Sequence, residues 1–195
     1  MKPADWWTPQ AQQQAFRAVL DGFARPGTRV PATPPGAVLM FLSAVLDESV
    51  SLADPGGVLG ADLRRLLLAP TAPAALARFV LLDGRRPPEA GFEPALGTLE
   101  SPEGGATLLL TVDAVGSSRS EATQEEDVVL HLQGPGVAGT RTLAVSGLHP
   151  DWLARRAAWV AAYPLGVDIV LAAPDALVAL PRTTRIEITA VAGEH

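Results

Sequence analysis

The sequence predicts an α/β fold in which a mixed β-sheet is covered by helices. Helical patterns dominate the first third of the chain, strand patterns dominate from residue 104 onward, and one helical pattern returns at residues 150–162. Helices and strands mixed in this order favour a sheet packed against helices. With 195 residues and a hydrophobic content of 48%, the chain is expected to form one domain over residues 1–195.

Three helices are expected in the first third. Residues 9–24 follow Thr8, a good N-cap, and apolar side chains recur at i, i+3, i+4 and i+7 from Phe16. The tripeptide Arg25-Pro26-Gly27 ends this helix. Residues 37–46 are apolar on nearly all sides, which predicts a buried helix, and residues 60–69 form the third.

Apolar runs separated by glycine- and proline-containing turns predict the strands. They are residues 50–53, 78–82, 106–112, 128–133, 140–145, 167–172, 176–180 and 184–191. The polar and acidic residues 117–127 are expected to form an exposed hairpin arm. Residues 83–97 form a long loop, a feature that is often functional or simply disordered.

The scarcity of two residue types, cysteine and lysine, excludes whole classes of chemistry. The chain has no cysteine, which excludes thiol nucleophiles, disulfides, cysteine-ligated zinc and iron–sulfur clusters. Its single lysine is Lys2, so there is no interior lysine for a Schiff base with pyridoxal phosphate and no lysine for a phosphate loop. We therefore expect no cofactor.

Charge and hydropathy indicate the compartment. The net charge is −6, so no nucleic-acid partner is expected. The longest apolar stretch, residues 36–46, is too short to span a bilayer, and the N-terminal residues lack the pattern of a secretory leader. The prediction is a cytoplasmic protein without a membrane partner.

Glycines and histidines offer only weak functional motifs. Gly134, Gly136 and Gly139 match G-x-G-x-x-G, but a strand pattern follows in place of a helix, so they predict a strand connection. His131 is expected to face outward from a strand, and His149 precedes a helix. Neither has the spacing of a metal motif, and no metal site is predicted.

The remaining candidates are equally modest. Ser146 lacks the G-x-S-x-G surroundings of a serine hydrolase, and Glu100 and Glu103 are expected to be solvated. Trp6 and Trp7 either anchor the N-terminus on the core or belong to a partner interface. No catalytic residue is assigned.

The segment 181–185, Pro-Arg-Thr-Thr-Arg, is the most suggestive run. Its arginines and hydroxyls, Arg182, Thr183, Thr184 and Arg185, offer donors suited to phosphate or carboxylate. Asp168, on a nearby predicted strand, gives the alternative of an internal ion-pair cluster. These five residues form a possible phosphate-binding or structural motif.

Five runs resemble one protein family along nearly the whole chain. They are QQQAFRAVLDGFARPGTRV (12–30), GTLESPEGGATLLLTV (97–112), LHLQGPGV (130–137), AYPLGVDIVLA (162–172) and LVALPRTTRIEI (177–188). In order and spacing they resemble the PhnH subunits of the carbon–phosphorus lyase system. The pair PLGVDIVL and ALPRTTRIE is the most specific part.

The resemblance implies a function. PhnH-like subunits belong to a core complex with subunits of the G, I and J types, which transfers a phosphonate onto the ribose of ATP and releases adenine. It implies a non-catalytic subunit, a homodimer, and a reduced fold like that of pyridoxal-phosphate-dependent transferases, without the cofactor. The alternative is an autonomous nucleotide- or phosphate-binding protein using Arg182–Arg185.

Overall fold

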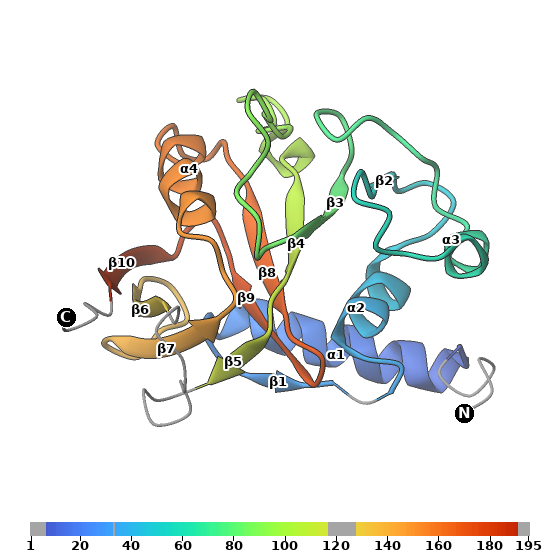
Figure 1. The fold of residues 1–195 in the computed structure, drawn as a ribbon, viewed down its shortest axis with the longest axis horizontal. Helices are drawn as coiled ribbons and strands as arrows, with labels where there is room; N and C mark the ends of the chain where they lie inside the picture. The colour runs from blue at the N-terminus through green and yellow to red at the C-terminus, as the bar shows by residue number, and fades with distance from the viewer. Residues whose placement is uncertain (1–6, 33, 117–127, 191–195) are drawn as a thin grey trace.

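The computed structural model describes residues 7–32, 34–116 and 128–190 (Figure 1). Within them the helices are α1 (Pro9–Ala24), α2 (Ala37–Val45), α3 (Ala61–Leu67) and α4 (Asp151–Trp159), with a 3-10 turn, η1 (Pro102–Gly104). The strands are β1 (Val30–Pro31), β2 (Leu52–Ala53), β3 (Phe79–Asp83), β4 (Thr107–Thr111), β5 (Ala114–Gly116), β6 (Val128–Gln133), β7 (Arg141–Ser146), β8 (Asp168–Ala172), β9 (Ala176–Leu180) and β10 (Arg185–Ala190). No helix in these ranges is long and apolar enough to cross a membrane.

A six-stranded mixed sheet, in the order β1-β9-β8-β4-β3-β2, forms the centre of the fold. Strands β2, β3, β4 and β8 are parallel, whereas β9 and β1 run antiparallel to their neighbours. In the central register Leu109 lies between Leu81 and Val170. The predicted α/β class and mixed sheet are confirmed. Strand β1 arises from a proline-containing segment for which the sequence pattern predicted no strand.

A second sheet, which the sequence pattern did not separate from the first, is antiparallel and has the order β10-β6-β7-β5. Its strand β5 was not predicted. The predicted hairpin arm at 117–127 lies outside the described residues. Two sheets form because β6 and β7 pair with β10 instead of joining the end of the six-stranded sheet.

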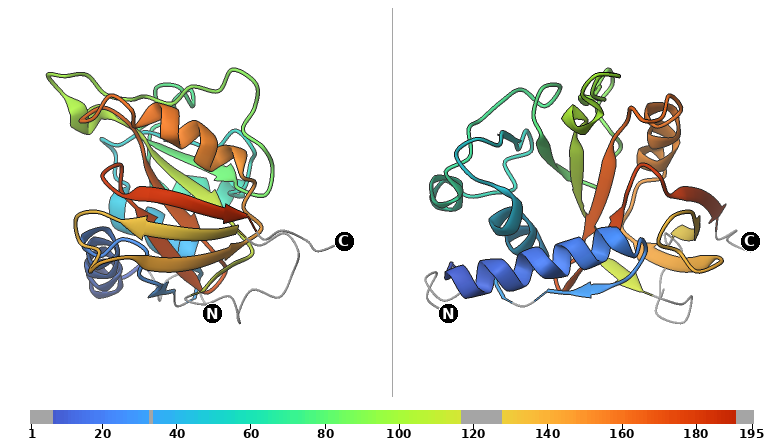
Figure 2. Two further views of the ribbon diagram at one scale, coloured as in Figure 1. Left: turned by 90° about the vertical axis from the view of Figure 1, so that its left-hand side faces the viewer. Right: turned by 180° about the vertical axis from the view of Figure 1, so that it is seen from behind.

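Two apolar clusters cover the faces of the six-stranded sheet. Leu81, Leu109 and Val170 face one cluster together with α1 and α2. Leu108 and Ile169 face the other, which contains residues of the second sheet and α4. Helices α1 and α2 lie on one side of the six-stranded sheet, and α4 and the second sheet lie on its other side (Figures 1 and 2). Burial on both faces explains why these strands read as continuous apolar runs.

Helix α1 begins as predicted, with the Thr8 hydroxyl accepting a hydrogen bond from the backbone N–H of Ala11 at 3.2 Å. The apolar stripe predicted for this helix is buried only in part, because Val19 is 3% exposed whereas Phe16 and Leu20 are 44% and 51% exposed. The buried residues are Ala15, Val19 and Gly22. Small residues on this face let the helix approach the sheet, since a Cβ on Gly22 would lie 3.1 Å from a methyl of Val30.

The remaining N-terminal predictions have mixed outcomes. Helix α2 is buried at most of its positions, as predicted. Trp7 is partly buried against the cluster that includes α1 and α2, as expected for a terminal anchor, and Trp6 lies outside the described residues.

Candidate functional site

Asp168 and Arg182 form an ion pair at the open end of the β8–β9 hairpin. Strands β8 and β9 pair antiparallel, with Ile169 opposite Leu180. The residue before Ile169 and the residues just after Leu180 therefore lie close together. Arg182 Nη2 lies 2.9 Å from Asp168 Oδ2, and the Arg182 backbone N–H donates to Asp168 Oδ1 at 2.7 Å. The two side chains are only 12% and 17% exposed, so the pair is largely removed from water.

Arg182 also holds two loops. Its Nη1 donates to the backbone carbonyls of Pro102, at 2.8 Å, and Pro164, at 3.2 Å. Gly105 leaves room for this arrangement, because a Cβ there would lie 2.9 Å from both terminal guanidinium nitrogens. Each side-chain nitrogen of Arg182 therefore has an internal acceptor, and this side chain joins η1, the loop before β8 and β8 itself.

The structure separates the other members of the predicted motif. Thr184 is 2% exposed, and its hydroxyl has no hydrogen-bond partner among the described residues. Thr183 is half-buried. Arg185 is exposed and opens β10, opposite Gln133. The ion pair Asp168–Arg182 is thus brought together, whereas Arg185 lies apart from it on the surface.

Sequence reasoning missed Arg156, which approaches the same turn from α4. Its Nη2 donates to the carbonyls of Pro181, at 2.6 Å, and Thr184, at 3.0 Å. The side chain is 4% exposed, and this burial lowers the pKa of the Arg156 guanidinium to about 10. The spacing from Trp152 was the signal for Arg156, since residues at i and i+4 share a helix face.

A further arginine joins this end of the sheet. Arg78 precedes β3 and donates from Nη1 to the carbonyl of Gly105. Burial lowers the pKa of its guanidinium, and the nearby charge of Asp168 opposes that effect. Arg78, Arg156 and Arg182 therefore surround one carboxylate near the amino ends of β3, β4 and β8.

The opposite, carboxyl end of the parallel strands carries the loop 83–97. Gly84 follows β3, donates to the carbonyl of Thr111 at 2.9 Å and accepts from the backbone N–H of His149 at 2.8 Å. A Cβ on Gly84 would lie 2.7 Å from that Thr111 oxygen, so only glycine fits without displacement. The loop leaves the sheet through a fixed backbone turn.

Helix α4 holds the rest of this loop. The indole N–H of Trp152 donates to the carbonyl of Arg86 at 2.8 Å, and Arg155 donates to the carbonyl of Phe92 at 2.9 Å. The indole N–H of Trp159 donates to Glu93 at 2.8 Å. The Phe92 ring meets both indoles edge-on. Long loops of this kind are often functional or simply disordered. In the structure this loop has an ordered course that is anchored on α4.

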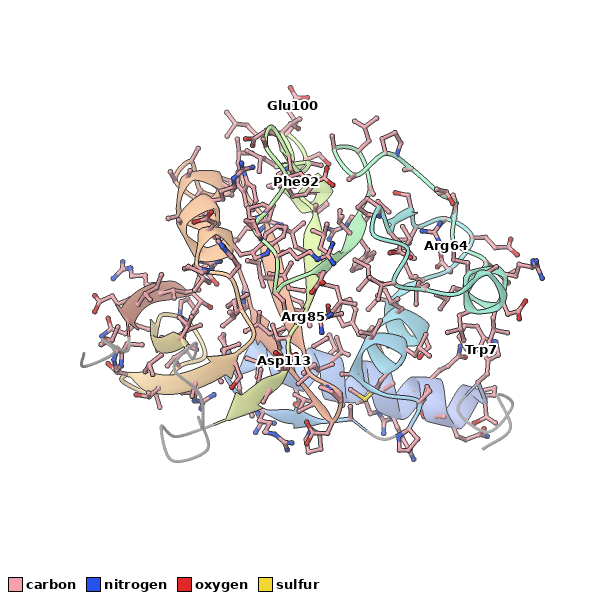
Figure 3. All side chains as sticks on the ribbon, viewed as in Figure 1. Trp7, Arg64, Arg85, Phe92, Glu100 and Asp113 are labelled. Carbon is pink, nitrogen blue, oxygen red and sulfur yellow. The ribbon has the colours of Figure 1, made fainter. Side chains whose placement is uncertain are left out.

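This loop borders a cavity of about 300 Å³. The apolar part of its lining consists of Leu82, Phe92 and Trp152, and the connection between β2 and α3 forms one wall. The charged residues of the lining are Asp83, Arg85, Arg86 and Glu89. Figure 3 shows Arg85 between Phe92 and Asp113 near the middle of the molecule. Sequence reasoning did not find this site, because its residues come from five separate segments of the chain.

The charges around the cavity are partly paired. Arg85 Nε donates to Asp83 Oδ1 at 2.7 Å, and its Nη1 lies 3.6 Å from Asp113. The hydrogen bond from Arg85 lowers the pKa of the Asp83 carboxyl. Arg86 is 84% exposed and lies 3.6 Å from Asp83. Asp83 is therefore held as a carboxylate, while the Arg86 guanidinium projects toward solvent.

The other candidates take the positions expected of them. Gly134, Gly136 and Gly139 connect β6 to β7, so the prediction of a strand connection is confirmed. His131 lies on the less buried face of β6, near the Thr142 hydroxyl at 3.4 Å.

The two glutamates near η1 and the possible metal ligands provide no further candidate site in the described part of the chain. Glu100 and Glu103 are exposed, and a hydrogen bond from Ser101 lowers the pKa of the Glu103 carboxyl. Within residues 7–32, 34–116 and 128–190, histidines and carboxylates form no group of three able to hold a metal ion.

Fold and site together define an α/β protein of two sheets, with an arginine-rich cluster at one end of the parallel strands and a cavity at the other. Residues 3–187 match the family of bacterial phosphonate metabolism proteins called PhnH, and the chain belongs to this family. It is 39% identical over 184 residues to the putative C-P lyase subunit protein HtxG of Stutzerimonas stutzeri, covering 93% of this chain and 89% of the relative. It is 32% identical over 197 residues to the alpha-D-ribose 1-methylphosphonate 5-triphosphate synthase subunit PhnH of Rhizobium meliloti (strain 1021), covering 90% of each.

Proposed function

We propose that this chain is a non-catalytic subunit of the carbon–phosphorus lyase core complex in phosphonate catabolism. In this role it supports transfer of a phosphonate onto the ribose of ATP with release of adenine. The match to the PhnH family over residues 3–187 carries the proposal, because it extends over nearly the whole chain. The two relatives named as subunits of such a system support it.

The geometry supports a structural role for the conspicuous arginine motif. Arg182 is engaged by Asp168 and by the carbonyls of Pro102 and Pro164. A guanidinium used in this way positions loops in preference to binding a substrate phosphate. The exposed Arg185 does not share its contacts.

The proposal includes partners and location. The chain assembles with subunits of the G, I and J types in the cytoplasm, and it self-associates as a homodimer. Its fold is a reduced form of the pyridoxal-phosphate-dependent transferase fold that carries no cofactor.

Two measurements test the proposal. A tagged chain is purified from cells of its host grown with a phosphonate as the sole phosphorus source, and the core subunits are expected to co-purify in a fixed ratio. Synthesis of the ribose triphosphate product is then measured with and without this chain. Loss of turnover on omission supports the proposal, whereas unchanged turnover contradicts it.

A further inference from the structure

The cavity beside loop 83–97 occupies a position where α/β sheets bind ligands. It lies at the carboxyl ends of parallel strands, since its lining includes Asp83, the last residue of β3, and Thr111, the last of β4. Open α/β sheets bind ligands in crevices outside the carboxyl ends of their strands. The volume of about 300 Å³ is at the small end of small-molecule sites.

The lining of the cavity carries three kinds of group. Phe92, Val58 and Leu82 offer apolar surface, and Val58 is 42% exposed although apolar. Asp83 and Glu89 offer carboxylate acceptors. The Arg86 guanidinium is 84% exposed, and its one ion pair in the described part of the chain is the 3.6 Å contact with Asp83.

The walls of the cavity are fixed before any ligand arrives. Trp152 is 2% exposed and binds the Arg86 carbonyl, so the backbone that carries Arg86 is held to α4. Arg155 holds the carbonyl of Phe92 in the same way. A pre-formed site loses little conformational entropy on binding.

We propose that this cavity binds a ribonucleotide. The base packs on the apolar surface of Phe92 and Val58, the ribose hydroxyls donate to the carboxylates of Asp83 and Glu89, and the phosphates accept from Arg86. A free phosphate would contact only the arginine, and an apolar ligand would leave the carboxylates without a partner. A ribonucleotide, in contrast, contacts all three kinds of group. The inference rests on the proposed function in one respect, because a complex that builds a ribose triphosphate handles ribonucleotides.

The test is calorimetric titration of the full chain with ATP, adenosine, deoxyATP and tripolyphosphate. ATP is expected to bind saturably, and the other three at least tenfold more weakly. Adenosine lacks the phosphates, deoxyATP lacks one ribose hydroxyl, and tripolyphosphate lacks both the base and the ribose. Arg86→Ala is expected to weaken ATP binding at least tenfold while leaving the unfolding midpoint unchanged. Arg65→Ala is the matched control, since Arg65 is 78% exposed on α3 and outside the cavity, and it is expected to bind like the parent chain.

Several outcomes overturn the inference. The first is the absence of saturable ATP binding up to about 1 mM, a concentration range that detects affinities near −4 kcal/mol. The second is equal binding of tripolyphosphate and ATP. The third is an equal loss of ATP affinity in Arg86→Ala and Arg65→Ala. Such results leave the proposed function intact if the chain still co-purifies with the core subunits and its omission abolishes turnover. If ATP binds but omission has no effect, the cavity inference stands and the proposed function fails.

Discussion

Arg182 and Arg156 reach the turn between β9 and β10 from two sides. Arg182 is paired with Asp168, while Arg156 donates to the carbonyls of Pro181 and Thr184 from α4. Burial of an arginine is costly unless acceptors replace most of the water that it loses. The motif that looks like a phosphate site in the sequence therefore has internal partners for its most buried cation.

Asp168→Asn is expected to lower the free energy of unfolding by about 2–3 kcal/mol, because it leaves a largely buried guanidinium without its counter-charge. Urea denaturation at neutral pH measures this loss. The control is Asp62→Asn, whose exposed partner Arg65 lies at 3.1 Å and whose removal is expected to change stability by less than about 0.5 kcal/mol. Equal effects of the two substitutions contradict the structural role of Asp168.

Thr184→Val is expected to leave stability unchanged or raise it by about 1 kcal/mol, since the buried hydroxyl has no hydrogen-bond partner in the described part of the chain. Valine keeps the shape of the side chain while removing the polar atom. Thermal unfolding measures the change, with Thr183→Val as the neighbouring, half-buried control. A loss above about 1 kcal/mol indicates that the hydroxyl has a partner such as a buried water.

At the scale of elements, periodicity predicts where helices and strands lie better than which face of a helix is buried. The stripe of large apolar residues in α1 suggested that Phe16 faces the core, yet the helix packs through Ala15 and Gly22. In α4 the buried face includes the charged Arg156. Close approach of backbones favours small residues, and a charged residue can be buried when a loop supplies acceptors.

Trp152→Phe is expected to release the loop after β3 from α4, because it removes the hydrogen bond to the Arg86 carbonyl. We expect a loss of about 1–2 kcal/mol in unfolding free energy. Trypsin is also expected to cleave after Arg85 several-fold faster. Tyr163→Phe, at a residue that is 65% exposed, serves as the control and is expected to leave the cleavage rate unchanged.

Gly136→Ala is expected to destabilise the fold by more than about 2 kcal/mol, because the new Cβ clashes with backbone atoms and the positive φ is unfavourable for alanine. Its Cβ would lie 2.2 Å from the carbonyl oxygen of Ala24 at the end of α1, and its φ is +79°. Gly139→Ala has a similar φ of +71° but nothing within 4 Å of the new Cβ, so about 1 kcal/mol of backbone strain is expected. Chemical denaturation of both variants checks the difference, and equal losses would rule out the packing role of Gly136.

For the whole molecule, the six-stranded sheet joins two apolar clusters that are separate in space. Neighbouring residues of β4 belong to different clusters, with Leu108 in one and Leu109 in the other. Because β4 contributes side chains to both clusters, unfolding of one cluster would also disrupt the sheet face on which the other cluster packs. One domain over residues 1–195 stays a prediction, and this arrangement suggests how to test it.

Leu108→Ala and Leu109→Ala are each expected to lower the free energy of unfolding by about 2–5 kcal/mol, because both side chains are fully buried. Each variant is expected to unfold in one transition, with tryptophan fluorescence and circular dichroism coinciding. Separate transitions for the two signals in either variant would contradict the single domain.

Local patterns in the sequence predicted the four helices, most of the strands, the α/β class and the family, because apolar periodicity, turn residues and the five matching runs are local properties of the chain. Only the tertiary structure decided that the strands form two sheets and that Arg182 pairs with Asp168 while Arg156 approaches from α4. It also decided that the loop after β3 borders a cavity. These features depend on contacts between residues far apart in the sequence, and local patterns carry no record of which distant groups will meet.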